Sequence, residues 1–219
     1  MTLAPPKDVL QKTWIFRMVH IDCLPTILAR DGLHAPSCAP NDGLPYTSIH
    51  AVQTQIDRGN RPVTRPPGGV IRDYVGFYFG PRSPMLLRLK TGHNVQQIDQ
   101  SRIVYLLSTA QAVAGAGLGF VFTDRHSLVK VADFRNDLAH LGIVDFPIAY
   151  AEQWNNTPAA PDRQEKKQAE FLVHQTMPWS LIFGIAVYND AVAAEVKHIL
   201  DQFPDRHQPG VRVKPAWYY

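Results

Sequence analysis

A glutamate at the head of an apolar strand is the feature that most limits how this chain can fold. Glu170 precedes Phe171–Val173, a run of the aromatic and β-branched residues that strands favour. An ionised carboxylate gains nothing from burial alone, because removing its charge from water is costly. The pattern therefore favours a strand that directs its carboxylate into a cleft. A strand end facing solvent is the alternative, since acidic residues are common on strand edges.

Further segments rich in apolar and aromatic residues predict other strands. They lie at 13–19, 74–79, 85–90, 103–108, 119–123 and 182–187, with 211–219 as a candidate edge strand. Helical spacing of apolar residues predicts helices after Asp22, over about 49–58 and over 190–203. We expect Asp22 to cap the first helix and Gly32 to end it. This order predicts a single α+β domain over 1–219 with a mixed central sheet.

The composition is that of an ordinary globular protein. Of the 219 residues, 45% are apolar and 19% are charged. No apolar run approaches the roughly 20 residues that span a bilayer, and the N-terminus lacks the layout of a secretory signal. With only Cys23 and Cys38, the sequence supports neither a disulfide framework nor a zinc cluster. Because two cysteines suit a reducing compartment, we expect a cytoplasmic protein. We expect a monomer, because no apolar interface stripe stands out.

Positive charge gathers in two groups. The first lies among prolines and glycines that predict an irregular loop, and comprises Arg58, Arg61, Arg65 and Arg72. The second ends a long, loop-rich region at about 131–168, and comprises Arg163, Lys166 and Lys167. A region of that length without clear periodicity is often functional. Basic loops beside a cleft suit a polyanion, although such charges are also common on solvated loops.

Several common kinds of site are missing from the sequence. The nine histidines are scattered without the short spacings of zinc sites, so no metal site is expected. There is no phosphate-binding glycine loop, no dinucleotide fingerprint after a strand, and no hydrolase nucleophile elbow. What remains is a set of separate segments around His20, Tyr78 and Glu170. Taken singly, His20 is more often structural and Tyr78 more often part of a core.

Three of these segments together resemble the DarT family of DNA ADP-ribosyltransferase toxins. They are Arg-Met-Val-His-Ile-Asp at 17–22 with Leu24, the aromatic block at 73–86, and Gln-Ala-Glu-Phe-Leu-Val at 168–173. The similarity covers nearly the whole chain, and the last two segments are the most specific. The sequence departs from the family pattern at Cys23, where Asn is expected, and at Gly76, where Pro is usual.

The resemblance implies an ADP-ribosyltransferase fold that holds NAD+ in a cleft between two small sheets. It also implies transfer of ADP-ribose from NAD+ to a base of single-stranded DNA, thymine in the best-known branch, without a metal ion. Members of the family act as toxins, and their usual partner is a macrodomain antitoxin of the DarG type.

The family motifs also imply roles for individual positions. Glu170 would be the catalytic carboxylate and Arg58 the catalytic arginine, with Arg61 as an alternative. The positions implied to bind NAD+ are His20, Asp22, Leu24, Gly32, Tyr78 and Met85. The positions expected to meet DNA are His126, Tyr150, Trp154, Arg163, Lys166 and Lys167. Aromatic residues among these could stack on bases, and cations could contact phosphates.

Two other functions stay open at this point. The same enzyme class could modify RNA or protein instead of DNA. A non-catalytic nucleic-acid-binding module could also retain the fold, in which case replacing Glu170 would change no reaction rate.

Overall fold

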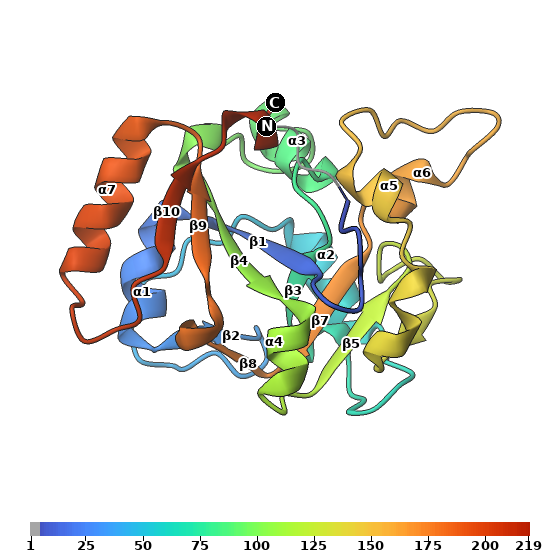
Figure 1. Ribbon diagram of the computed structural model, residues 1–219, viewed down its shortest axis with the longest axis horizontal. Helices are drawn as coiled ribbons and strands as arrows, with labels where there is room; N and C mark the ends of the chain where they lie inside the picture. The colour runs from blue at the N-terminus through green and yellow to red at the C-terminus, as the bar shows by residue number, and fades with distance from the viewer. Residues whose placement is uncertain (1–4) are drawn as a thin grey trace.

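The computed structural model describes residues 5–219 and places most strands in one large sheet (Figure 1). Eight strands pair in the order β10-β9-β4-β1-β3-β7-β5-β6. Their bounds are β1 Trp14–His20, β3 Tyr74–Tyr78, β4 Ile103–Thr109, β5 Phe120–Thr123, β6 Phe134–Arg135, β7 Glu170–His174, β9 Gly184–Val187 and β10 Gly210–Val213. A second, two-stranded sheet joins β2 (Gly32–His34) to β8 (Thr176–Pro178). The sheet is mixed, because β10 runs parallel to β9 and its other pairs are antiparallel. This confirms the predicted α+β class.

The large sheet consists of two halves joined at a single position. Strand β1 pairs with β4 along its full length, but with β3 only through Phe16 and Tyr78. Strand β3 then pairs with β7 along its length, so that Tyr78 lies opposite Glu170. The two small sheets that the family resemblance implies are therefore the two halves of one sheet, which separate beyond the Phe16–Tyr78 pair.

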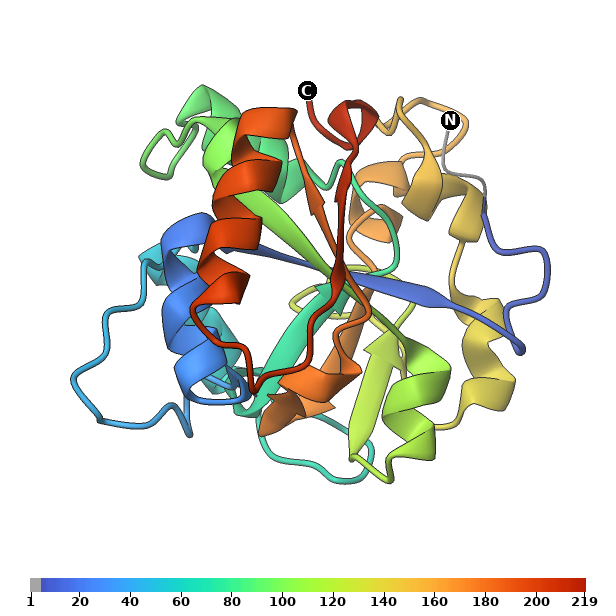
Figure 2. The ribbon, with the colours of Figure 1, turned by 60° about the vertical axis from the view of Figure 1, so that its left-hand side comes forward.

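Helices and the C-terminal segment cover both faces of the sheet (Figure 2). The helices are α1 Leu24–Ala29, α2 Val52–Asn60, α3 Pro84–Thr91, α4 Ala110–Gly115, α5 Phe146–Tyr150, α6 Arg163–Lys166 and α7 Asp190–Asp201. Helices α1 and α7 pack in the same core cluster as Ile15 and Val19. Helix α3 and Trp217 pack with Phe16 and Met18 in a second cluster. Strand β1 is thus buried on both faces, which fixes the edge of the cleft. None of the described helices is both long and apolar enough to cross a membrane.

The prediction of a strand at 85–90 is wrong, because this segment belongs to helix α3. The Ser83 hydroxyl caps the helix by accepting a hydrogen bond from the Leu86 amide, and Pro84 stands at its first position. Leu86 and Leu89, three residues apart, are both buried on one side. A short apolar run of this kind is compatible with a strand or with a helix. Here the Ser83 cap favours the helix.

The first helix also begins differently from the prediction. Asp22 lies in a 3-10 turn, Ile21–Cys23, and its amide donates to the His20 ring, so His20 is the capping residue. Helix α1 ends at Ala29, and Gly32 already belongs to β2. Of the edge strand predicted at 211–219, only 211–213 are confirmed, as part of β10 (Gly210–Val213), and Pro215–Trp217 forms a 3-10 turn.

Candidate active site

The carboxylate of Glu170 is buried at the start of β7 and meets two donors. Its side chain is only 5% exposed, and Arg58 Nη1 lies 3.0 Å from Oε1 and 3.2 Å from Oε2. The Ser127 hydroxyl donates a hydrogen bond of 2.7 Å to Oε2. The strand therefore directs its carboxylate inward, as the sequence pattern favours, and the solvent-facing alternative is wrong.

These contacts keep the carboxylate ionised despite its burial. Burial alone would raise the pKa of Glu170, but the positive charge of Arg58 and the Ser127 hydrogen bond outweigh it, and the pKa lies below its usual value. The neighbouring His126 has a pKa lowered by burial, so its ring is neutral near pH 7. Arg58 is thus the cation that stabilises this carboxylate.

The last turn of α2 brings Arg58 to the carboxylate, whereas Arg61 points elsewhere. Arg61 donates to the carbonyls of Ser127, Val129 and Lys130, at 3.3, 3.0 and 3.2 Å, and so holds the loop that carries Ser127. Gly76 in β3 leaves room for Arg58, because a Cβ at this glycine would lie 3.2 Å from Arg58 Nη2. Of the two arginines that the sequence leaves open, only Arg58 contacts Glu170.

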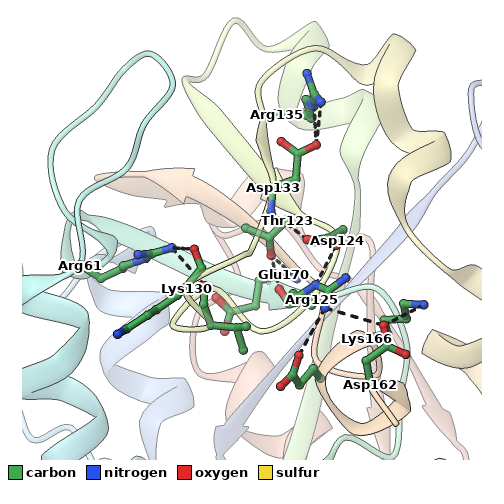
Figure 3. A network of polar contacts seen from close by, with 12 residues as sticks. Arg61, Thr123, Asp124, Arg125, Lys130, Asp133, Arg135, Asp162, Lys166 and Glu170 are labelled. Atoms are coloured by element: carbon green, nitrogen blue, oxygen red, sulfur yellow. Dashed lines mark hydrogen bonds and ion pairs between the residues drawn. The ribbon is translucent and has the colours of Figure 1, made fainter. Parts of the chain in front are cut away.

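A network of ion pairs joins the loop after β5 to the helix before β7 (Figure 3). Arg125 contacts Asp124 at 2.8 Å and reaches Glu165 and Asp162 at 3.4 and 3.7 Å. The Thr123 hydroxyl donates to the Arg125 carbonyl and accepts from the Glu170 amide. Because these residues flank His126 and Ser127, the network fixes both side chains relative to the Glu170 carboxylate.

Two adjoining cavities open where β1 and β3 separate. An inner cavity of about 70 Å³ reaches Glu170, and an outer cavity of about 370 Å³ lies beside β2 and the segment 39–48. The residues that border both cavities are Arg17, Pro36, His50 and Gln55. Because the linings share these residues, the two cavities lie on either side of them, and the inner cavity ends at Glu170.

The structure brings half of the positions implied for NAD+ to this cleft. Tyr78 and Met85 line the inner cavity, and Gly32 lines the outer one. His20, Asp22 and Leu24 line neither. Asp22 pairs with Arg102 and with the His20 ring, at 2.9 and 3.3 Å, and Leu24 is fully buried in the core.

The predicted role of Lys167 as a phosphate contact is wrong. Its side chain is buried, and its ammonium donates to the carbonyls of Pro81, Ala149 and Ala151 at 2.9, 2.7 and 2.9 Å. Three carbonyl acceptors use all three protons of the ammonium, so no donor remains for DNA. Lys167 instead ties the chain before β7 to the turn after β3.

The other residues predicted to meet DNA have mixed surroundings. His126 lines the inner cavity beside Glu170. Trp154 is buried and its indole donates to the Tyr219 hydroxyl at 2.8 Å, so it belongs to the core of this segment. Tyr150 packs partly buried against Phe16. Arg163 donates to the Gln153 carbonyl, and the half-exposed Lys166 pairs with Asp162.

Sequence reasoning missed Ser127 and Thr123. A serine and a threonine in a polar loop carry no local sign of catalysis, and only the fold brings them to Glu170 over 43 and 47 positions. Within residues 5–219 no group of three or more histidine, cysteine or acidic side chains could hold a metal ion.

Known proteins with a similar sequence or fold are ADP-ribosyltransferases of DNA. Residues 16–219 match the family model described as ssDNA thymidine ADP-ribosyltransferase, DarT. A DNA ADP-ribosyl transferase of Thermus sp. (strain 2.9) is 44% identical over 209 residues, covering 95% of this chain and 97% of that protein. The fold matches Thermus sp. 2.9 DarT solved with ADP-ribosylated ssDNA, with a TM-score of 0.90 and 42% identity over all of both chains. It also matches that protein with NAD+, with a TM-score of 0.86 and 42% identity over 99% of this chain and all of the other. With the buried Glu170–Arg58 pair beside the inner cavity and this match over residues 16–219, the chain belongs to the DarT family of ADP-ribosyltransferases.

Proposed function

We propose that this chain transfers ADP-ribose from NAD+ to thymidine in single-stranded DNA, through one catalytic domain over residues 1–219. The observation that carries the proposal is the Glu170 carboxylate, kept ionised by Arg58 at the end of the cleft, in a chain that belongs to the DarT family. We also propose that it acts in the cytoplasm as the monomeric toxin of a pair whose partner is a DarG-like macrodomain antitoxin.

Glu170 serves two purposes in the proposed reaction. NAD+ supplies an electrophilic ribose carbon, from which nicotinamide leaves as a neutral base with the electron pair of the broken glycosidic bond. The Glu170 carboxylate stabilises the positive charge that develops on the ribose. The thymine ring nitrogen that forms the new bond must lose its proton, and the same carboxylate is placed to accept that proton. The products of the reaction are therefore nicotinamide, ADP-ribosylated DNA and one proton.

Arg58 and the polar groups around it support this chemistry. Arg58 holds Glu170 ionised in a buried site, and its fixed charge can stabilise the base as the base loses its proton. His126, neutral and next to the carboxylate in the inner cavity, is placed to orient the incoming base by a hydrogen bond. We infer that Arg163 and Lys166, on the segment before β7, contact DNA phosphates through their positive charge.

A single assay with four acceptors tests the proposal. The purified chain is incubated with labelled NAD+ and either a thymidine-containing single-stranded oligonucleotide, the same oligonucleotide without thymidine, an RNA, or a protein mixture. We expect label only on the thymidine-containing DNA, and none with Glu170→Gln, which preserves the shape of the side chain. Label on RNA or protein would refute the acceptor. No label on any acceptor, with DNA binding retained, would favour a non-catalytic module.

A further inference from the structure

Arg17 lies where the two halves of the sheet separate. It follows Phe16, the only residue of β1 that pairs with β3. Its side chain crosses the gap, and Nη1 donates to the Gly76 carbonyl in β3 at 2.8 Å. Arg17 also borders both the inner and the outer cavity. Within residues 5–219, Arg17 is therefore one of the four residues at the junction of the two cavities, and the only arginine among them.

Arg17 lacks a counter-ion among the residues that the structure describes. Its Nε is buried without a hydrogen-bond partner, and its charge forms no ion pair within 5–219. Two other arginines around the cleft differ, because Arg58 pairs with Glu170 and Arg30 pairs with Asp42. Charged groups that leave water are normally paired and hydrogen-bonded. An unpaired guanidinium fixed at a cavity wall is thus placed to receive an anion.

The charges around Arg17 leave a net positive balance. Arginines at 17, 30, 58 and 72 line the two cavities. Glu170 offsets Arg58 and Asp42 offsets Arg30, whereas Arg17 and Arg72 form no ion pair within residues 5–219. His50 borders both cavities, and burial together with Arg17 and Arg58 lowers its pKa to about 3, so it adds no charge near neutral pH. The narrow part of the cleft is therefore cationic.

We propose that Arg17 binds the pyrophosphate of NAD+ where the two cavities meet, with the nicotinamide ribose in the inner cavity and the adenosine in the outer one. This proposal rests on the proposed use of NAD+. A guanidinium presents several N–H groups in one plane, so the part of it that borders the cavities can bind phosphate oxygens while Nη1 stays on Gly76. Arg17 is thus a binding residue, and by holding the pyrophosphate it places the ribose carbon near Glu170.

The test measures binding of ADP-ribose and of adenosine, together with the kinetics of DNA modification. Arg17→Met removes the charge and keeps an unbranched side chain. Loss of hydrogen bonds to a charged group corresponds to an increase of about 10- to 100-fold in the Kd of ADP-ribose and the KM for NAD+. The Kd of adenosine, which lacks phosphate, should not change. Arg206→Met is the matched control, because Arg206 also donates to a carbonyl but pairs with Asp31 and lines neither cavity.

Each result of these measurements either supports or overturns the role proposed for Arg17. An unchanged Kd for ADP-ribose in folded Arg17→Met would overturn it, and so would a raised KM for DNA with an unchanged KM for NAD+. If Arg17→Met does not fold, Arg17→Lys decides. A lysine keeps the charge but loses the planar fork, so a raised Kd for ADP-ribose with unchanged adenosine binding supports the proposal, and unchanged binding of both overturns it.

The same measurements separate this proposal from the proposed function. A native chain that binds ADP-ribose through Arg17 but transfers nothing to DNA would contradict the function and leave the role of Arg17 standing. A native chain that modifies DNA, with the same KM for NAD+ in Arg17→Met, would contradict only the role of Arg17.

Discussion

Arg58 and Glu170, 112 residues apart in the sequence, form a buried ion pair at the inner end of the cleft. The pair joins α2 to β7, so it links the two elements on either side of the inner cavity. Its value for catalysis comes from burial, because charges interact more strongly where water is excluded. Burial also makes the pair vulnerable, because removing one partner leaves the other charge uncompensated.

Arg58→Met should abolish most of the activity and also weaken the fold. The unpaired Glu170 destabilises the protein by about 3–5 kcal/mol, and removal of a charge at the reacting centre lowers kcat by about 10²- to 10³-fold. Arg58→Lys keeps the charge, so it should lower kcat with a smaller loss in Tm. DNA modification at saturating NAD+ and thermal unfolding measure the two effects.

Arg61→Met is the control for this position. It should lower the rate only several-fold, because Arg61 holds the carbonyls of the Ser127–Lys130 loop and does not contact Glu170. Equal losses of kcat in Arg58→Lys and Arg61→Met would contradict the assignment of Arg58.

Ser127→Ala should shift the pH dependence of the reaction. The Ser127 hydroxyl stabilises the ionised form of Glu170 and helps to hold its pKa below the usual value. Without that hydrogen bond the pKa rises, and activity that needs the carboxylate is lost at a higher pH as the solution is acidified. The acidic limb of the kcat/KM profile should therefore move to higher pH, while the rate near pH 8 falls little. An acidic limb that stays in place would show that this hydrogen bond does not control the titration.

The local features of the site could be predicted from the sequence, but its assembly could not. The apolar run after Glu170 predicts a strand and favours an inward carboxylate, although a solvent-facing strand end fits the same pattern. The family motifs indicate Arg58 or Arg61, and the choice between them depends on the direction in which each leaves α2. Ser127 meets Glu170 only because β5 and β7 are neighbours in the sheet, and nothing near Ser127 in the sequence encodes that.

Lys167 shows why charge patterns mislead in such a segment. In the sequence it follows Lys166 and looks like part of a basic surface. In the structure the two neighbours face different surroundings, since Lys166 pairs with Asp162 near the surface while Lys167 enters a ring of carbonyls. Those carbonyls come from the turn after β3, 86 positions away, and from the end of α5, 18 and 16 positions away.

Lys167→Met should therefore destabilise the protein without changing the salt dependence of its affinity for single-stranded DNA. Several buried carbonyls lose their donor, which costs about 3 kcal/mol in the free energy of unfolding. The salt dependence of single-stranded DNA affinity should stay as in the native chain. Lys166→Met should show the opposite, with nearly native stability and a slope of log K against log salt that is smaller by about 0.7, the value for one phosphate contact. A reduced slope in folded Lys167→Met would restore its predicted role in DNA binding.

The two cysteines should differ sharply in reactivity. Cys23 is buried, and burial raises the pKa of its thiol to about 11, while its Sγ donates to the Thr47 carbonyl at 3.3 Å. Cys38 is exposed. Only the thiolate reacts with iodoacetamide, so the native chain at pH 7.5 should gain one label, on Cys38, as read by peptide mass spectrometry. Cys23 should react only after unfolding in guanidinium. Labelling of Cys23 in the native chain at a rate close to that of Cys38 would mean that the turn Ile21–Cys23 opens readily, and with it the support of the segment that borders the outer cavity.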